Sequence, residues 1–167
     1  VRYDLATQAH NMEYNKDLSI VISLYNEEES LPELITWIEK VATEQAYNYE
    51  IILVDDGSTD GSYNLCNDLA EKDSRIKVIH QDNHGPGAAR NNGVDNATGD
   101  YLTFVDSDDT VDTNMYREMI NYADKYDADI VCSTFSPKEN MQDVSVFSKQ
   151  EALVNRLKTH LITDSTV

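Results

Sequence analysis

The sequence predicts an open α/β fold in which helices cover a mostly parallel sheet. Five short apolar runs, each bounded by polar or glycine-rich residues, lie at 18–24, 51–54, 76–79, 101–105 and 130–132. Continuous apolar runs are typical of strands buried on both faces, whereas alternating runs are typical of strands with one wet face. Segments with helical periodicity separate the runs, so strand and helix alternate as they do in sheets with right-handed crossovers.

The first helix is predicted directly after the first strand. Ser30-Leu31-Pro32-Glu33 has the spacing of a capping box, and Pro32 lies in the first turn, where its missing N–H is not needed. Apolar residues then recur on one helical face: Leu31, Leu34, Ile35, Ile38, Val41 and Ala42. Further helices are predicted over 62–72, 87–94 and 115–125, and a last one over 150–161.

The length of 167 residues suits one domain with a packed core. Residues 1–17 are polar and lack the apolar stretch of a signal peptide, so we interpret them as an N-terminal extension. The core is predicted over 18–136, and 137–167 is interpreted as the start of a further, truncated segment. The sequence contains no run of 18 apolar residues, so it predicts no membrane span.

The charge balance argues against nucleic acid as a partner. Thirty-one acidic and 13 basic residues give a formal net charge of −18, and the resulting field repels polyanions. Such a protein binds a phosphate ester only where a metal ion or a few basic side chains supply positive charge locally. Cys66 and Cys132 have no CxxC partner, which favours free thiols in a reducing cytoplasm over a disulfide.

Acidic residues follow four of the predicted strands. In open parallel sheets, ligands bind beyond the carboxyl ends of the strands, so these turns are expected to meet at one edge. The turns begin Tyr25-Asn26-Glu27-Glu28-Glu29, Asp55-Asp56-Gly57-Ser58, His80-Gln81-Asp82 and Asp106-Ser107-Asp108-Asp109. Carboxylates in a small space repel one another, and a divalent cation among them would remove that repulsion.

Asp106 and Asp108 are the predicted metal ligands. Their carboxylates come one residue apart, directly after an apolar run, and hard cations such as Mn²⁺ or Mg²⁺ prefer oxygen ligands of this kind. The alternative is an aspartate-rich turn that caps the next helix.

Three further side chains are candidate ligand contacts. Asp56 stands beside a glycine that permits a tight turn, and its carboxylate can accept hydrogen bonds from a base or a ribose. Arg90 can neutralise a diphosphate, or it can form a structural salt bridge with one of the many acids. Tyr25 can stack on a base, or it can pack within its own loop.

Four segments resemble family 2 glycosyltransferases with a GT-A (Rossmann-like) fold. They are SIVISLYNEE at 19–28, ILVDDGSTDG at 52–61, GAARNNG at 87–93 and GDYLTFVDSDD at 99–109. They occur in the family's order and spacing and cover about 18–135. The resemblance implies inverting, metal-dependent transfer of a sugar from a nucleoside diphosphate donor to an acceptor hydroxyl.

The resemblance also implies roles for individual residues. The donor-binding residues would be Ser23, Tyr25, Glu27, Asp56, Arg90 and Asp106. Asp106 and Asp108 would form the DxD motif that binds Mn²⁺ or Mg²⁺. In the family the general base lies further downstream, in an acceptor-side segment, and 137–167 would be the truncated start of that segment. The base is therefore expected beyond Val167, and the catalytic residue of this chain stays unassigned.

Partners and location follow from the resemblance alone. A UDP-sugar is the favoured donor, although these motifs do not separate uridine from guanosine or thymidine. A sugar or lipid-linked acceptor in polysaccharide or glycan biosynthesis is expected. The expected location is the cytoplasm, with peripheral association of the full-length protein at the inner face of the membrane.

Two other functions remain open at this stage. Asp106-Ser-Asp108-Asp-Thr110 also satisfies the D-x-D-x-T pattern of haloacid dehalogenase-type phosphatases, in which the first aspartate is a nucleophile. That motif normally opens its fold, whereas here it follows the fourth strand. The second alternative is a nucleotide-binding module without turnover.

Overall fold

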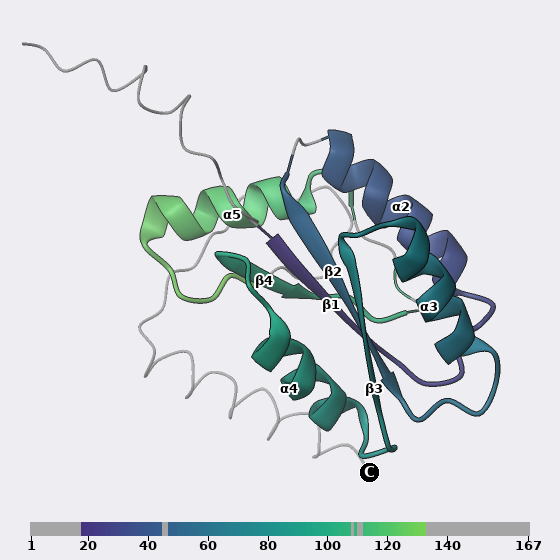
Figure 1. The fold of residues 1–167 in the computed structure, drawn as a ribbon. Coiled ribbons are helices and arrows are strands. Elements are labelled where there is room, and N and C mark those ends of the chain that lie inside the picture. Colours follow the sequence, from purple (N-terminus) through teal and green to yellow (C-terminus); the bar gives the residue numbers. More distant parts are fainter. Residues whose placement is uncertain (1–17, 45–46, 108, 110–111, 133–167) are drawn as a thin grey trace, which may run out of the picture. The chain divides into compact units, whose positions relative to one another are not determined.

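The computed structural model describes residues 18–44, 47–107, 109 and 112–132 (Figure 1). The chain divides into two compact units after Arg117, and each unit is described by itself. The sheet and the helices that pack on it belong to the first unit.

Four parallel strands form the sheet in the order β3-β2-β1-β4 (Figure 1). The strands are β1 (Leu18–Leu24), β2 (Tyr49–Asp56), β3 (Ile76–Gln81) and β4 (Tyr101–Phe104). The predicted α/β parallel sheet is therefore confirmed. Strands β2 and β3 were added on one edge of β1, whereas β4 pairs with the other edge of β1. The direction in which the chain adds strands thus reverses at β1, and sheets of this kind bind ligands at such a reversal.

The fifth strand, predicted at 130–132, is wrong. These residues follow the last described helix without forming a strand, and Ile130 is 79% exposed. Three apolar residues are fewer than a typical strand contains, and an apolar run stabilises a strand only when it is buried. Exposure of Ile130 removes that stabilisation.

The helices are α2 (Leu31–Glu44), α3 (Ser62–Lys72), α4 (Pro86–Asn96) and α5 (Met115–Tyr126). The predicted inner face of α2 is confirmed, because all six of its apolar residues are buried. The Ser30 hydroxyl donates backward, to the carbonyl and the carboxylate of Glu27. The helix predicted over 150–161 lies outside the described residues, and in the described part no helix is long and apolar enough to cross a membrane.

Alternation along the strands divides the core into two layers. Ile20, Ile22 and Leu53 face α2 and α3 in the larger cluster. Val21 and Ile52 face the opposite side, where they form a smaller cluster with Ala89 of α4. Figure 1 shows α4 on the other side of the sheet from α2 and α3. Side chains near a strand end therefore also alternate between the two layers, so adjacent polar residues there face opposite sides of the sheet.

Helix α4 approaches β1 closely at Gly93. A Cβ atom built on Gly93 would lie 2.3 Å from Cγ1 of Val21, far inside van der Waals contact. Glycine is therefore needed here for space, and the contact fixes the height of α4 above the sheet.

A buried carboxylate holds the turn that follows α4. Glu50 is 2% exposed, and its Oε1 accepts hydrogen bonds from the Ser19 hydroxyl at 2.8 Å and from the Thr98 amide and hydroxyl at 2.7 Å each. Buried charge is costly unless it is hydrogen-bonded, and here it is. This network lies at the amino-terminal ends of β1 and β2, away from the strand ends where ligands are expected.

Candidate functional site

A cleft of about 270 Å³ opens at the carboxyl ends of β1, β2 and β4. We call it the strand-end cleft. Its walls come from the ends of these strands and from the start of α4. It is lined by Ser23, Leu24, Tyr25, Glu27, Asp56, Pro86, Ala89, Arg90, Asp106 and Ser107. All six residues predicted to bind a donor thus line one cleft.

Parity along the strands explains why these side chains meet. Ser23 follows Val21 by two residues and Asp56 follows Val54 by two, so both face the side on which α4 packs. Asp106 follows Phe104 by the same interval, and Phe104 is the register partner of Val21. The strand-end cleft is the continuation of this layer beyond the sheet.

The carboxylate of Asp56 is held rigidly at the cleft wall. Oδ1 accepts from the Gln81 side chain at 2.7 Å and from the His84 amide at 2.9 Å, and Oδ2 accepts from the Gly85 amide at 2.8 Å. Burial acts to raise the pKa of Asp56, but these donors outweigh it and hold that pKa below the usual aspartate value. Asp56 therefore stays ionised and fixed in orientation.

Asp55 points away from the strand-end cleft. Adjacent strand residues face opposite layers, so Asp55 lies on the side of α3, where its Oδ2 is 2.6 Å from Nδ1 of His80. The ring of Tyr63 lies 4.4 Å from that of His80. His84 instead places its Nδ1 2.6 Å from the carbonyl of Asp82. Neither histidine, nor Asp55, lines the cleft, so the expectation that all the strand-end acids meet at one edge is only partly met.

Arg90 and Asp106 form an ion pair within the cleft. Nη2 of Arg90 donates to Oδ1 of Asp106 at 2.5 Å, and the two side chains are 38% and 50% exposed. A pair this exposed contributes about 0–1 kcal/mol to stability. The guanidinium can therefore leave the carboxylate at small cost when a stronger anion enters the cleft.

Tyr25 and Glu27 form the wall contributed by the loop after β1. Tyr25 is 47% exposed, which leaves much of its ring accessible. One carboxylate oxygen of Glu27 accepts from the Ser30 hydroxyl at 2.5 Å, so the side chain is tied to the start of α2.

Gln81 and Asn92 support Asp56 and were missed by the sequence analysis. Asn92 Nδ2 donates to Gln81 Oε1 at 2.8 Å, which orients the Gln81 amide so that its Nε2 points at Asp56. The available signal was strand register, because Gln81 lies two residues after the apolar run at 76–79 and pairs across the sheet with Asp56.

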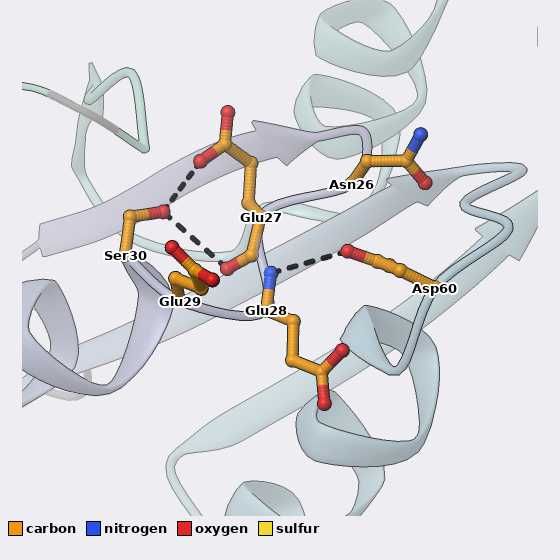
Figure 2. A pocket seen from close by; sticks show the side chains of 6 residues that line it. All are labelled: Asn26, Glu27, Glu28, Glu29, Ser30 and Asp60. Atoms are coloured by element: carbon orange, nitrogen blue, oxygen red, sulfur yellow. Dashed lines mark hydrogen bonds between the residues drawn. The ribbon is translucent and has the colours of Figure 1, made fainter.

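A second hollow, of about 470 Å³, lies beside the strand-end cleft (Figure 2). We call it the acidic loop pocket, and it is lined by Asn26, Glu27, Glu28, Glu29, Ser30 and Asp60. Asp60 accepts from the amides of Glu28 and Ser62, and Glu28 accepts from the amide of Gly61. Among the residues that the structure describes, its lining holds four carboxylates and no basic side chain, so this part of it does not suit a phosphate group.

The predicted metal site is described only in part. Asp108 lies outside the described residues, and among the described residues no cluster of three or more acidic, histidine or cysteine side chains could hold a metal. The half-exposed Asp106 is still a suitable oxygen ligand, since Mg²⁺ is commonly bound by one or two carboxylates together with substrate phosphates.

Several known proteins are similar to this chain in sequence. A family model described as "Glycosyl transferase family 2" matches residues 19–165. The glycosyltransferase GlyG of Streptococcus pneumoniae is 42% identical over 120 residues, which cover 71% of this chain and 38% of GlyG. The chain thus spans well under half of that relative's length.

Solved structures agree on the fold. S. aureus TarS in complex with UDP-GlcNAc superimposes with a TM-score of 0.61 at 26% identity, over 76% of this chain and 38% of TarS. A mannosyltransferase from Pyrobaculum calidifontis, in complex with GDP-Man and Mn²⁺, gives a TM-score of 0.57 at 22% identity, over 66% and 33% of the two chains.

Proposed function

The chain belongs to glycosyl transferase family 2, and we propose that its strand-end cleft binds the nucleoside diphosphate of a sugar donor. The observation that carries the proposal is the gathering of Ser23, Tyr25, Glu27, Asp56, Arg90 and Asp106 around one cleft. These residues come from separate segments, and the topology of the sheet brings them together at the point where strand order reverses.

We place the base at the Tyr25 and Asp56 end. An accessible tyrosine ring offers a stacking surface, and a fixed carboxylate accepts a hydrogen bond from a base N–H. Because three donors already orient Asp56, little entropy is lost when it accepts one more.

We place the diphosphate at the Arg90 and Asp106 end. Within the described lining of the cleft, the guanidinium of Arg90 is the basic group, and phosphate competes well with a half-exposed carboxylate for it. Asp106, and Asp108 as the expected second ligand, would hold Mn²⁺ or Mg²⁺. Such an ion stabilises the leaving diphosphate as a Lewis acid.

A UDP-sugar remains the proposed donor. TarS was solved with a uridine nucleotide and the mannosyltransferase with a guanosine nucleotide, so the fold alone does not select the base. The cleft volume of about 270 Å³ is small for a whole nucleotide sugar, which favours binding of the nucleotide here and of the sugar further along the protein.

The proposed reaction of the full-length protein is inverting transfer to an acceptor hydroxyl. The bond from the anomeric carbon to the diphosphate breaks, the acceptor oxygen bonds to that carbon, and a carboxylate accepts the hydroxyl proton. No described residue is assigned as this base. Family membership favours transfer over the phosphatase chemistry considered for Asp106 and Asp108. The acceptor, polysaccharide biosynthesis and the cytoplasmic, membrane-peripheral location stay predictions.

Calorimetric titration tests the proposal. UDP, GDP and dTDP are titrated into the protein with Mn²⁺ and with EDTA, using wild type, Asp56→Ala and a matched control, Asp95→Ala. Asp95 is an exposed carboxylate on α4 that does not line the cleft.

We expect Mn²⁺-dependent binding of UDP that Asp56→Ala weakens at least about tenfold, the cost of a charged hydrogen bond. Asp95→Ala should bind as wild type does. The proposal is wrong if no nucleotide binds, or if Asp56→Ala binds as tightly as the control.

A further inference from the structure

Two loops beside the strand-end cleft are joined by reciprocal hydrogen bonds. One loop, 25–30, connects β1 to α2, and the other, 57–61, connects β2 to α3. Three bonds join the loops: Asn26 N to Ser58 Oγ at 2.9 Å, Thr59 N to Asn26 Oδ1 at 2.8 Å and Gly61 N to Glu28 Oε2 at 3.0 Å. A fourth bond, Glu27 N to Ser62 Oγ at 2.8 Å, ties the first loop to the first residue of α3. Donors and acceptors alternate between the two loops, so neither can shift alone.

Asn26 is the centre of this contact. Its amide donates to Ser58, and its Oδ1 accepts from both the amide and the hydroxyl of Thr59. It does not line the strand-end cleft, although its neighbours Tyr25 and Glu27 both do. Figure 2 shows the side chains of Asn26, Glu27 and Glu28 leaving the loop in different directions. Asn26 thus faces the second loop, while its neighbours face the cleft.

The backbone of Asn26 has a left-handed conformation, with φ at 57°. Most L-residues disfavour this region by about 1–2 kcal/mol, and asparagine tolerates it better than most. The left-handed residue turns the chain between Tyr25 and Glu27, and both of these flanking residues line the cleft.

The second loop is a firm support. Ser58 N donates to Oδ1 of the fully buried Asp55, which is itself paired with His80. Gly57 also has a positive φ of 74°, and a Cβ there would lie 2.8 Å from the amide of Asn83. Close packing and a buried carboxylate therefore fix the loop that holds Asn26.

We propose that Asn26 is a positioning residue, which holds Tyr25 and Glu27 in the strand-end cleft through its contacts with Ser58 and Thr59 and thereby raises nucleotide affinity. The inference rests on the proposed binding of a nucleoside diphosphate in that cleft. It also gives the acidic loop pocket a role, since Asn26, Glu28 and Asp60 join the two loops there.

The test compares two substitutions at one position. Asn26→Gly keeps the left-handed backbone accessible but removes the Oδ1 acceptor, whereas Asn26→Asp keeps an acceptor oxygen. The matched control is Asp127→Gly, which changes the other non-glycine residue with positive φ in the described part of the chain and does not line the cleft. UDP affinity is measured with Mn²⁺, and melting temperature is measured in parallel.

We expect Asn26→Gly to weaken UDP binding roughly five- to tenfold, the equivalent of one net hydrogen bond, while the melting temperature changes little. Asn26→Asp should recover most of the lost affinity, and Asp127→Gly should bind as wild type does. A loss of affinity that merely parallels a loss of stability in all three variants would overturn the inference.

A double-mutant cycle separates positioning from a general structural role. If Asn26 acts through Tyr25, then Asn26→Gly should cost much less affinity in a Tyr25→Ala background than alone. Equal losses in both backgrounds, or no loss in either, contradict the inference while leaving the proposed function intact. Failure of the wild-type protein to bind any nucleotide removes both.

Discussion

Substitution of Gly93 by alanine tests the packing that fixes α4. The new Cβ would lie 2.3 Å from Cγ1 and 3.2 Å from Cγ2 of Val21, which is fully buried. Ordinary contact begins near 3.4 Å, so helix and strand must separate by about 1 Å. Branching at Cβ restricts the χ1 angle of Val21, and both of its methyl groups face the new Cβ, so rotation of the side chain does not relieve the contact.

The expected magnitude is the difference of two effects. A Cβ only 2.3 Å from a buried methyl group takes the upper part of the overpacking range, about 2–3 kcal/mol, while alanine is favoured over glycine in a helix interior by about 1 kcal/mol. We therefore expect a net loss of about 1–2 kcal/mol in the free energy of unfolding, measured by urea denaturation. Because Arg90 lies one turn before Gly93, UDP affinity should fall as well.

Val21→Ala provides the control for this prediction. It removes both methyl groups that the new Cβ would strike, at a cost of its own of about 1–3 kcal/mol. The loss of unfolding free energy in the double variant should then be smaller, by about 1 kcal/mol or more, than the summed losses of the two single variants. Additive losses, or a Gly93→Ala protein as stable as wild type, would refute the packing argument.

Three further predictions concern polar groups. Arg90→Ala should weaken UDP binding about tenfold by calorimetry, because a charged partner of the diphosphate is lost. It should change the free energy of unfolding by less than about 1 kcal/mol, because the Arg90–Asp106 pair is exposed, and a larger loss of stability would contradict this. Glu50→Ala should cost about 1–3 kcal/mol in urea denaturation, since the Thr98 amide and the hydroxyls of Ser19 and Thr98 lose the carboxylate that accepts from them, and an unchanged midpoint would show that the network is dispensable. The pKa of Asp56 is depressed in the folded state, so its ionisation stabilises the protein above pH of about 4 and ceases to do so as pH falls through the folded-state pKa. The stability advantage of wild type over Asp56→Asn should accordingly shrink on acidification, and a constant or growing difference would contradict the assignment.

The sheet was predictable because its strands are unusually simple. β1 and β2 are buried along nearly their whole length, so hydrophobic burial alone selects them from the sequence. Burial also explains why the strand predicted at 130–132 is wrong. This run has the composition of a strand, but it is not buried, since Ile130 is exposed. Sequence shows which residues are apolar, but only the fold shows which of them are covered.

The strand-end cleft was predictable in its members but not in its contacts. Topology and motif order together indicated Asp56, Arg90 and Asp106, and all three line the cleft. Arg90 could pair with either a ligand or an acid, and only coordinates showed that it pairs with Asp106. Adjacent residues of a strand face opposite sides of the sheet, so Asp55 and Asp56 lie in different layers. The expectation of a single acidic edge did not take this alternation into account.

The residues that position the cleft side chains could not be identified from the sequence. Gln81 and Asn92 are uncharged, and although Asn92 belongs to the segment at 87–93, nothing in that segment indicates its partner. The bond from Asn92 to Gln81, which orients Gln81 toward Asp56, depends on how α4 packs in the folded chain. Asn26 belongs to a motif, but its left-handed backbone and its bonds to the second loop are properties of the folded chain.

A crystal structure of the protein with UDP and Mn²⁺ shows whether the strand-end cleft binds the nucleotide. We expect the uracil to lie in the strand-end cleft against Tyr25 and Asp56, with the diphosphate at Arg90 and Asp106 and the Arg90–Asp106 pair opened. A nucleotide bound outside this cleft, or one bound with that ion pair intact and Asp56 untouched, would contradict it.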